Sequence, residues 1–256
     1  MKRVLTAALL IPAVLYLVFL AHPLLFLAAV VLVAGLCFHE YSALVRGHGL
    51  ALVRPFGFVA GLLVLLVPGP EPLILTLLAL IGLVLALRAD SPAQVLPLAA
   101  ATLLGIIYVF GAWRCAIGLR DIHPHWLAFA LILNWVGDIA AYATGRAIGR
   151  HRLAPQLSPK KTWEGSAGSA VLSALFGGLY LPTFLPAVSV AQAVALAVAG
   201  NVAGQLGDLA ESALKRGAGV KDSGTLLPGH GGMLDRVDSA LFTLPVVYLW
   251  VLRPWG

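Results

Sequence analysis

Long runs of apolar residues, broken only by short polar loops, are the feature that most restricts what this chain can fold into. A transmembrane helix needs about 20 consecutive, predominantly apolar residues, and runs of this kind recur along the whole sequence. Only 11% of the residues are charged, whereas an ordinary soluble domain is about 25% charged. Because two-residue alternation of apolar and polar positions is missing, a β-barrel is disfavoured. The sequence therefore predicts an all-α fold, a polytopic integral membrane bundle.

We expect about nine transmembrane helices, because a span needs about 17–25 apolar residues. Two runs, at about 24–38 and 56–67, are short and less certain, so seven or eight spans remain alternatives. No polar block is long enough to form a separate soluble domain. Residues 1–125 and 126–256 are therefore interpreted as the N-terminal and C-terminal helices of one integrated membrane domain. The clear candidate spans are 4–21, 73–87, 96–113, 126–145, 166–185, 190–209 and 238–252.

The distribution of Lys and Arg predicts the orientation in the membrane. With nine spans and a cytoplasmic N-terminus, Arg114, Arg120 and Arg253 lie outside and the other 14 of the 17 Lys and Arg residues lie inside. Such an excess is typical of cytoplasmic loops. We therefore predict a protein of the cytoplasmic (inner) membrane whose two most charged loops, 146–165 and 211–237, face the cytoplasm. Short basic loops at a membrane favour contact with lipid headgroups, and we expect no nucleic-acid binding.

The stretch KDSGTLLPGHGGMLDRVDS, from Lys221 to Ser239, concentrates charge around a glycine-rich turn. Glycines let the backbone approach a ligand closely, and His230 in this turn could contact a substrate. Asp235 and Asp238 are three residues apart, so a helix starting here would place them side by side. Both could act as simple helix caps. Asp235 is the better candidate for a Mg²⁺ ligand, because this ion prefers carboxylate and phosphate oxygens.

A polar stripe precedes this stretch. If residues 201–216 are helical, Asp208, Glu211, Ser212 and Lys215 share one face. A charged side chain at membrane depth costs about 2.5–3.5 kcal/mol on insertion scales, so it usually faces a partner or a water-filled cavity. The stripe therefore indicates a polar site; the alternative is that Glu211 marks the point where the helix leaves the bilayer.

A second polar group lies upstream, along one face of a predicted helix. Its members are Asn134, Asp138, Tyr142, Gly145 and Arg146. Lys160 and Lys161 then precede another predicted helix, with Thr162 as its N-cap. Cations beside a helix N-terminus are suited to binding phosphate, although basic loop residues can also serve topology alone. The common phosphate-loop and hydrolase motifs are missing. We expect His39 and Glu40, at the end of an apolar run, to lie at the membrane interface.

These polar segments resemble the phosphatidate cytidylyltransferase family, also called CDP-diacylglycerol synthases. The resemblance covers 27 consecutive positions of this chain. Gly137-Asp138 and the SPKKTWEG segment from Ser158 to Gly165 are also similar to the family, whereas residues 1–125 resemble it only as apolar spans. The 27-residue pattern is Ser212-x-Leu214-Lys215-Arg216, Lys221-Asp222, Pro228-x-His230-Gly231-Gly232 and Asp235-Arg236-x-Asp238.

The resemblance implies an enzyme that transfers the CMP moiety of CTP to phosphatidate, giving CDP-diacylglycerol and pyrophosphate. It implies Mg²⁺ near Asp208 and Asp235, suggests a monovalent cation such as K⁺ beside it, and favours a homodimer among membrane lipids. We expect the triphosphate or the phosphatidate headgroup to be held by Lys215, Arg216, Lys221 and Arg236. The expected substrate contacts are Asp138, Lys160, Lys161, Ser212, Asp222, His230, Gly231 and Gly232.

Two other functions fit parts of the sequence. A CDP-alcohol phosphotransferase also handles liponucleotides, but its family has an Asp-Gly-x-x-Ala-Arg core and this chain has no Asp-Gly dipeptide. A transporter could line an ion or lipid path with Asp138 and Asp208. Such a protein would not need a polar pattern of 27 residues, so the enzyme remains the favoured prediction.

Overall fold

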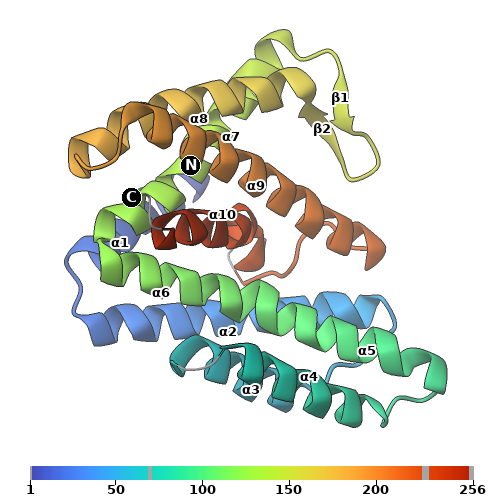
Figure 1. Cartoon of the computed structure of the whole chain (residues 1–256). Helices are drawn as coiled ribbons and strands as arrows, with labels where there is room; N and C mark the ends of the chain where they lie inside the picture. The colour runs from blue at the N-terminus through green and yellow to red at the C-terminus, as the bar shows by residue number, and fades with distance from the viewer. Residues whose placement is uncertain (1, 69–70, 227–230, 254–256) are drawn as a thin grey trace. The chain divides into compact units, whose positions relative to one another are not determined.

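The described part of the chain is mostly helical and contains one short β-hairpin (Figure 1). The computed structural model describes residues 2–68, 71–226 and 231–253. The helices are α1 (Lys2–Phe19), α2 (Pro23–Gly47), α3 (Arg54–Leu66), α4 (Glu71–Ala86), α5 (Pro92–Gly105), the π-helix η1 (Ile106–Gly111), α6 (Ala112–Ile122), α7 (Pro124–Ile148), α8 (Trp163–Phe184), α9 (Val190–Gly217) and α10 (Leu234–Leu252). The strands are β1 (Arg152–Ala154) and β2 (Ser158–Thr162).

Each predicted apolar run corresponds to a helix, so the predicted helical class is confirmed apart from the hairpin. Five helical stretches in the described residues are long and apolar enough to cross a membrane: 23–47, 92–122, 124–148, 163–184 and 190–217. These identify a membrane protein. The count of about nine spans is not confirmed, because α3 and α4 have only 13 and 16 residues and α10 carries three charged residues near its start.

Two helices run further than the apolar pattern predicts. α2 continues to Gly47 and α9 to Gly217, well past the expected ends at about residues 38 and 209. The predicted ends followed apolar content alone. The helices continue through polar residues that find partners in the fold, among them Glu40 in α2 and Lys215 in α9.

The chain divides into two compact units. The first comprises Met1–Thr6, His22–Arg114 and Leu214–Arg236. The second comprises Ala7–Ala21, Cys115–Ala213 and Val237–Gly256. Each unit contains a polar cluster of its own, and the residues singled out from the sequence are shared between the two.

Aromatic rings pressed against glycines hold the first unit together. The Phe38 ring covers Gly57 and the Tyr41 ring covers Gly105, so a Cβ at either glycine would overlap a ring. The Tyr41 hydroxyl also donates to the carbonyl of Ala101 over 2.8 Å. Small residues that let helices approach closely are typical of membrane bundles. This packing fixes the part of α2 that carries Glu40.

Small residues also dominate the contacts in the second unit, where α7 and α8 pack side by side. β1 and β2 pair as an antiparallel hairpin between these two helices. Thr162 is the N-cap of α8, as predicted: its hydroxyl accepts the Gly165 N–H over 3.1 Å. Because Lys160 and Lys161 immediately precede this cap, the hairpin delivers both to the start of α8.

Candidate active site

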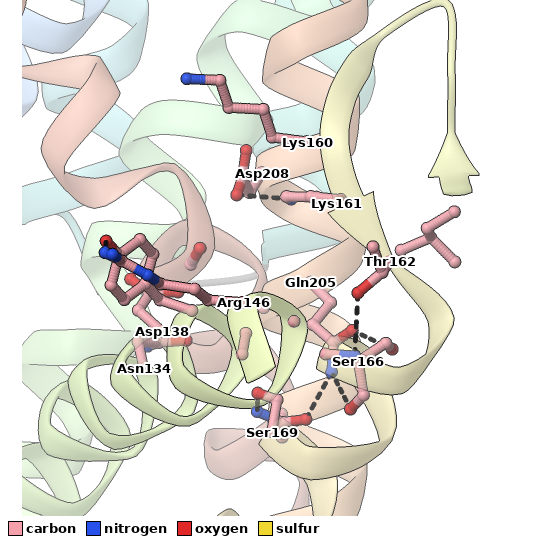
Figure 2. Close-up of a pocket in the computed structure, with 18 residues that line it drawn as sticks. Asn134, Asp138, Arg146, Lys160, Lys161, Thr162, Ser166, Ser169, Gln205 and Asp208 are labelled. Atoms are coloured by element: carbon pink, nitrogen blue, oxygen red, sulfur yellow. Dashed lines mark hydrogen bonds and ion pairs between the residues drawn. The ribbon is translucent and has the colours of Figure 1, made fainter. Parts of the chain in front are cut away.

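A pocket of about 350 Å³ in the second unit gathers the upstream polar group (Figure 2). α7 is unbroken from Pro124 to Ile148, so polar residues one turn apart reach the pocket together, as predicted. Strand β2 and helices α8 and α9 supply the other polar walls. The polar lining residues are Asn134, Asp138, Tyr142, Arg146, Lys160, Lys161, Thr162, Ser166, Ser169, Asn201, Gln205, Asp208 and Ser239.

Charges of both signs meet in this pocket. Lys161 Nζ lies 2.5 Å from Asp208 Oδ2, and the two side chains are 26% and 32% exposed (Figure 2). Asp138 adds a second carboxylate, and Arg146 and Lys160 add two more cations. An accessible ion pair is worth little to stability. The charges can therefore exchange partners with an incoming anion or cation at small cost.

A chain of hydrogen bonds forms one wall of the pocket and joins α7, α8 and α9. The Ser166 hydroxyl donates to Gln205 Oε1, and Gln205 Nε2 donates to Asn201 Oδ1 over 2.6 Å. Asn201 Nδ2 then donates to Ser169 Oγ, which donates to the Gly137 carbonyl, each over 2.9 Å. This series of hydrogen bonds was not predicted from the sequence; its signal is polar residues at helical spacing inside two apolar runs.

The first unit holds a second and more closed cluster. Lys215 Nζ lies 2.5 Å from Asp235 Oδ1, with side chains only 10% and 5% exposed. Asp235 Oδ2 accepts the backbone N–H groups of Ser223 over 2.9 Å and Gly232 over 2.7 Å. Burial by itself raises the pKa of Asp235, but the hydrogen bonds from Lys215, Gly232 and Ser223 outweigh it and hold that pKa below its ordinary value.

Two glycines allow the backbone to wrap around Asp235. Gly231 has φ +77°, a conformation that favours glycine, and a Cβ there would lie 2.5 Å from Asp235 Oδ2. A Cβ at Gly232 would overlap Ser223 Oγ and the Glu40 carboxylate. The backbone therefore does approach an anion closely here, but that anion is a carboxylate of the protein and not the ligand that the sequence predicts. Contact of these glycines with a substrate stays a prediction.

The other predicted residues are placed as follows. Ser212 is buried in the second unit and lies 3.4 Å from Asp208 Oδ1, while Glu211 is 0% exposed. In the first unit, Arg216 is exposed and donates to the Val220 carbonyl over 3.0 Å. Asp238 Oδ1 accepts the Ser239 N–H over 2.7 Å, and because α10 begins at Leu234, Asp238 lies inside the helix and is not its N-cap. Lys221, Asp222 and Arg236 are exposed, and His230 lies outside the described residues.

Glu40 is buried inside the first unit, a placement that was not predicted from the sequence. The residue is only 6% exposed, and its carboxylate accepts hydrogen bonds from Ser223, Met233 and Leu234. His39 beside it is exposed. The signal for Glu40 was an acidic residue within a helix that is otherwise apolar, because such a residue needs donors when it is buried.

Few side chains in the described residues are placed to bind a metal ion together. They contain no group of three or more His, Cys, Asp and Glu side chains suited to hold one ion. Asp138 and Asp208 in the pocket nevertheless fit Mg²⁺, since this ion usually takes one or two carboxylates and completes its shell with substrate phosphates and water. At Asp235, a cation would have to displace the Lys215 ammonium.

Helices that are long and apolar enough to cross a membrane, together with a pocket that gathers carboxylates and cations, define the class as a membrane protein with a charged pocket. The chain belongs to the cytidylyltransferase family, whose model matches residues 1–252.

The chain is similar to several proteins named phosphatidate cytidylyltransferase, and two of them illustrate the likeness. That of Staphylococcus saprophyticus is 37% identical over 155 residues, which cover 60% of each chain. That of Bacillus subtilis is 37% identical over 148 residues, 57% of this chain and 55% of the relative. The aligned part of the chain thus spans less than two thirds of the relatives' length.

Proposed function

We propose that this protein is a CTP:phosphatidate cytidylyltransferase, which transfers CMP from CTP to phosphatidate and releases pyrophosphate. The observation that carries the proposal is the pocket in which Asp138 and Asp208 lie among Lys160, Lys161 and Arg146. Membership of the cytidylyltransferase family supports the nucleotide chemistry. The printed names of the relatives support phosphatidate as the acceptor.

The proposed reaction joins two anions, so positioning and charge neutralisation carry most of the catalysis. A phosphatidate oxygen forms a bond to the α-phosphorus of CTP, and the bond from that phosphorus to the pyrophosphate oxygen breaks. Phosphatidate is already ionised near neutral pH, so no side chain needs to remove a proton. Lys160, Lys161 and Arg146 neutralise the phosphates and hold them in line.

Asp208, with Asp138, would hold Mg²⁺ in the pocket, where the ion supplies positive charge to the triphosphate oxygens. Lys161, which pairs with Asp208 in this structure, would then be available to phosphate. Asp235 as a second metal ligand and a monovalent cation such as K⁺ remain part of the proposal. In the first unit, Lys215 keeps the Asp235 carboxylate in place by direct ion pairing.

The proposal includes a site that faces the cytoplasm, because CTP is a cytoplasmic substrate and the basic loops favour that side. It also includes placement in the inner membrane among lipids and a homodimeric state, which the family resemblance favours. The 60% apolar composition supports direct access to a lipid substrate.

A direct assay tests the function. The full chain, purified in detergent, is given phosphatidate, Mg²⁺ and CTP labelled at the α-phosphate. We expect label in the lipid fraction, one pyrophosphate per lipid formed, and no product with EDTA. Asp138→Asn should lower turnover at least about tenfold, whereas Asp121→Asn, an exposed acid outside the pocket, should not.

Two results would overturn the proposal. A transporter gives no labelled lipid under any of these conditions. A CDP-alcohol phosphotransferase consumes CDP-diacylglycerol with an alcohol, releases CMP and has no requirement for CTP.

A further inference from the structure

We propose that Glu40, on α2, is a positioning residue that fixes the described ends of the 223–234 segment, residues 223–226 and 231–234, and thereby holds the Asp235 carboxylate in place. The expected effect of Glu40 on catalysis rests on the proposed function, whereas its structural role in holding the segment does not. Glu40, Ser223 and Asp235 all belong to the first unit, so their contacts lie within one compact body.

Both oxygens of the Glu40 carboxylate receive hydrogen bonds from the segment. Oε1 accepts the Met233 N–H over 2.9 Å, and Oε2 accepts the Leu234 N–H over 2.8 Å and the Ser223 hydroxyl over 2.9 Å. Met233 and Leu234 lie at the start of α10. The first N–H groups of a helix lack partners within it and carry partial positive charge. Glu40 thus supplies from another helix the acceptors that a local N-cap would give.

The backbone is shaped to fit this carboxylate. A Cβ at Gly224 would lie 2.6 Å from Glu40 Oε1, and a Cβ at Gly232 would overlap Oε2. Two glycines, one near each end of the segment, therefore pack directly on Glu40. On the other side, the Phe38 and Tyr41 rings anchor α2 against glycines of α3 and α5. The Glu40 carboxylate therefore has little freedom to move, and its hydrogen bonds tie the described ends of the segment to α2.

Ser223 connects Glu40 to Asp235. Its hydroxyl lies 2.9 Å from Glu40 Oε2 and 3.0 Å from Asp235 Oδ2, and its N–H donates to Asp235 Oδ2. A hydroxyl has one hydrogen to donate, so the two carboxylates share a single donor. Gly232 makes a second connection, because its N–H donates to Asp235 while its Cα packs on Glu40. Removing the Glu40 charge should therefore loosen Asp235 without touching it.

The test replaces Glu40 with Gln, which keeps the shape but puts an N–H₂ donor where a carboxylate accepted N–H groups. Amide hydrogen exchange is measured on the full chain in detergent. We expect exchange at residues 231–236 to rise at least about tenfold while the α7 and α8 amides stay unchanged. Unchanged exchange at 231–236, or a uniform rise along the chain, overturns the proposal. Glu40→Asp keeps the charge but is shorter, and replaces the Gln variant if that variant does not purify.

The kinetic arm separates this inference from the proposed function. We expect Glu40→Gln to lower kcat about 10- to 100-fold with the KM for CTP within about threefold, since the Glu40 carboxylate bonds Ser223, Met233 and Leu234, all in the first unit, whereas the residues proposed to bind the nucleotide belong to the second. Asp121→Asn, an exposed acid, is the matched control. A wild-type kcat in Glu40→Gln sinks the positioning role. A wild type that makes no labelled lipid sinks the proposed function, and the exchange measurement still decides whether Glu40 holds the segment.

Discussion

Each of the two units contains a lysine–aspartate ion pair, and the two pairs differ in how far they are buried. In the second unit, Lys161 and Asp208 meet over 2.5 Å with about a quarter to a third of each side chain exposed. In the first, Lys215 and Asp235 meet over the same distance but are almost completely enclosed, with added backbone donors on Asp235. An exposed pair is worth about 0–1 kcal/mol, whereas removing one partner of a buried pair costs about 3–5 kcal/mol.

The difference in exposure suits the two pairs to different tasks, although the sequence predicts that all four residues belong to one site. A pair that is weakly held can release its charges to phosphates and a metal ion, which suits the pocket. A pair that is buried and saturated with donors holds the backbone around it, which suits the glycine-rich segment.

The largest expected effect concerns the buried pair. Lys215→Met leaves the Asp235 charge buried without its cation, so we expect the free energy of unfolding to fall by about 3–5 kcal/mol. The matched change in the pocket, Lys161→Met, should cost less than about 1 kcal/mol. Chemical unfolding in detergent, followed by circular dichroism, measures both. Equal losses in the two variants would remove the distinction between the units.

A smaller but still large effect is expected at Gly232. A Cβ there overlaps Ser223 and Glu40, so Gly232→Ala should lower the free energy of unfolding by about 1–3 kcal/mol. Gly82 in α4 is the control, because a Cβ there meets only the Phe56 ring at an ordinary 3.6 Å. Gly82→Ala should therefore be neutral or slightly stabilising. The comparison fails if the two variants unfold alike.

The pH dependence of stability sharpens the same contrast. The pKa of Asp235 is lower in the folded protein than in the unfolded chain, because the bonds from Lys215, Gly232 and Ser223 outweigh the opposing effect of burial. Its stabilisation is therefore present above the unfolded value of about 3.9 and is lost as the pH falls through the lower folded value. Unfolding measured between about pH 3 and pH 7 should show a shallower acid-side slope in Asp235→Asn than in wild type. An unchanged slope would mean that Asp235 does not contribute.

The smallest expected effect is that of Lys160→Gln. Lys160 is exposed, so its contribution to stability should be below about 0.5 kcal/mol. Because Lys160 is a phosphate-binding cation in the proposed pocket, Lys160→Gln should raise the KM for CTP by about 3- to 10-fold, with a smaller effect at high salt. Steady-state kinetics at two ionic strengths check this. A KM that is insensitive to the substitution would place Lys160 outside the site.

Much of the pocket could be predicted because its signals are local. Asn134, Asp138 and Tyr142 share a face in any unbroken helix, and the sequence between them contains no proline. Thr162 is a good N-cap residue followed by a helical run, and it caps α8 as expected. These predictions required only the period of an α-helix and the chemistry of its first turn.

The rest depended on contacts between distant residues. Glu40 and Ser223 are 183 positions apart, and neither helical period nor composition indicates that an acid inside α2 caps the start of α10. The number of spans could not be predicted from the sequence either. The length of an apolar run does not fix where a helix ends, because polar residues with buried partners let the helix continue. The β1–β2 hairpin was missed because strands of three and five residues carry almost no pattern.

The most direct test of the central claim compares turnover and stability in one variant of the pocket. Asp208→Asn keeps the shape of the side chain but removes the charge that meets Lys161 and, in the proposed reaction, Mg²⁺. We predict that transfer of label from CTP to phosphatidate falls at least about 100-fold while the free energy of unfolding changes by less than about 1 kcal/mol. Turnover at the wild-type rate in a folded Asp208→Asn protein would contradict the account.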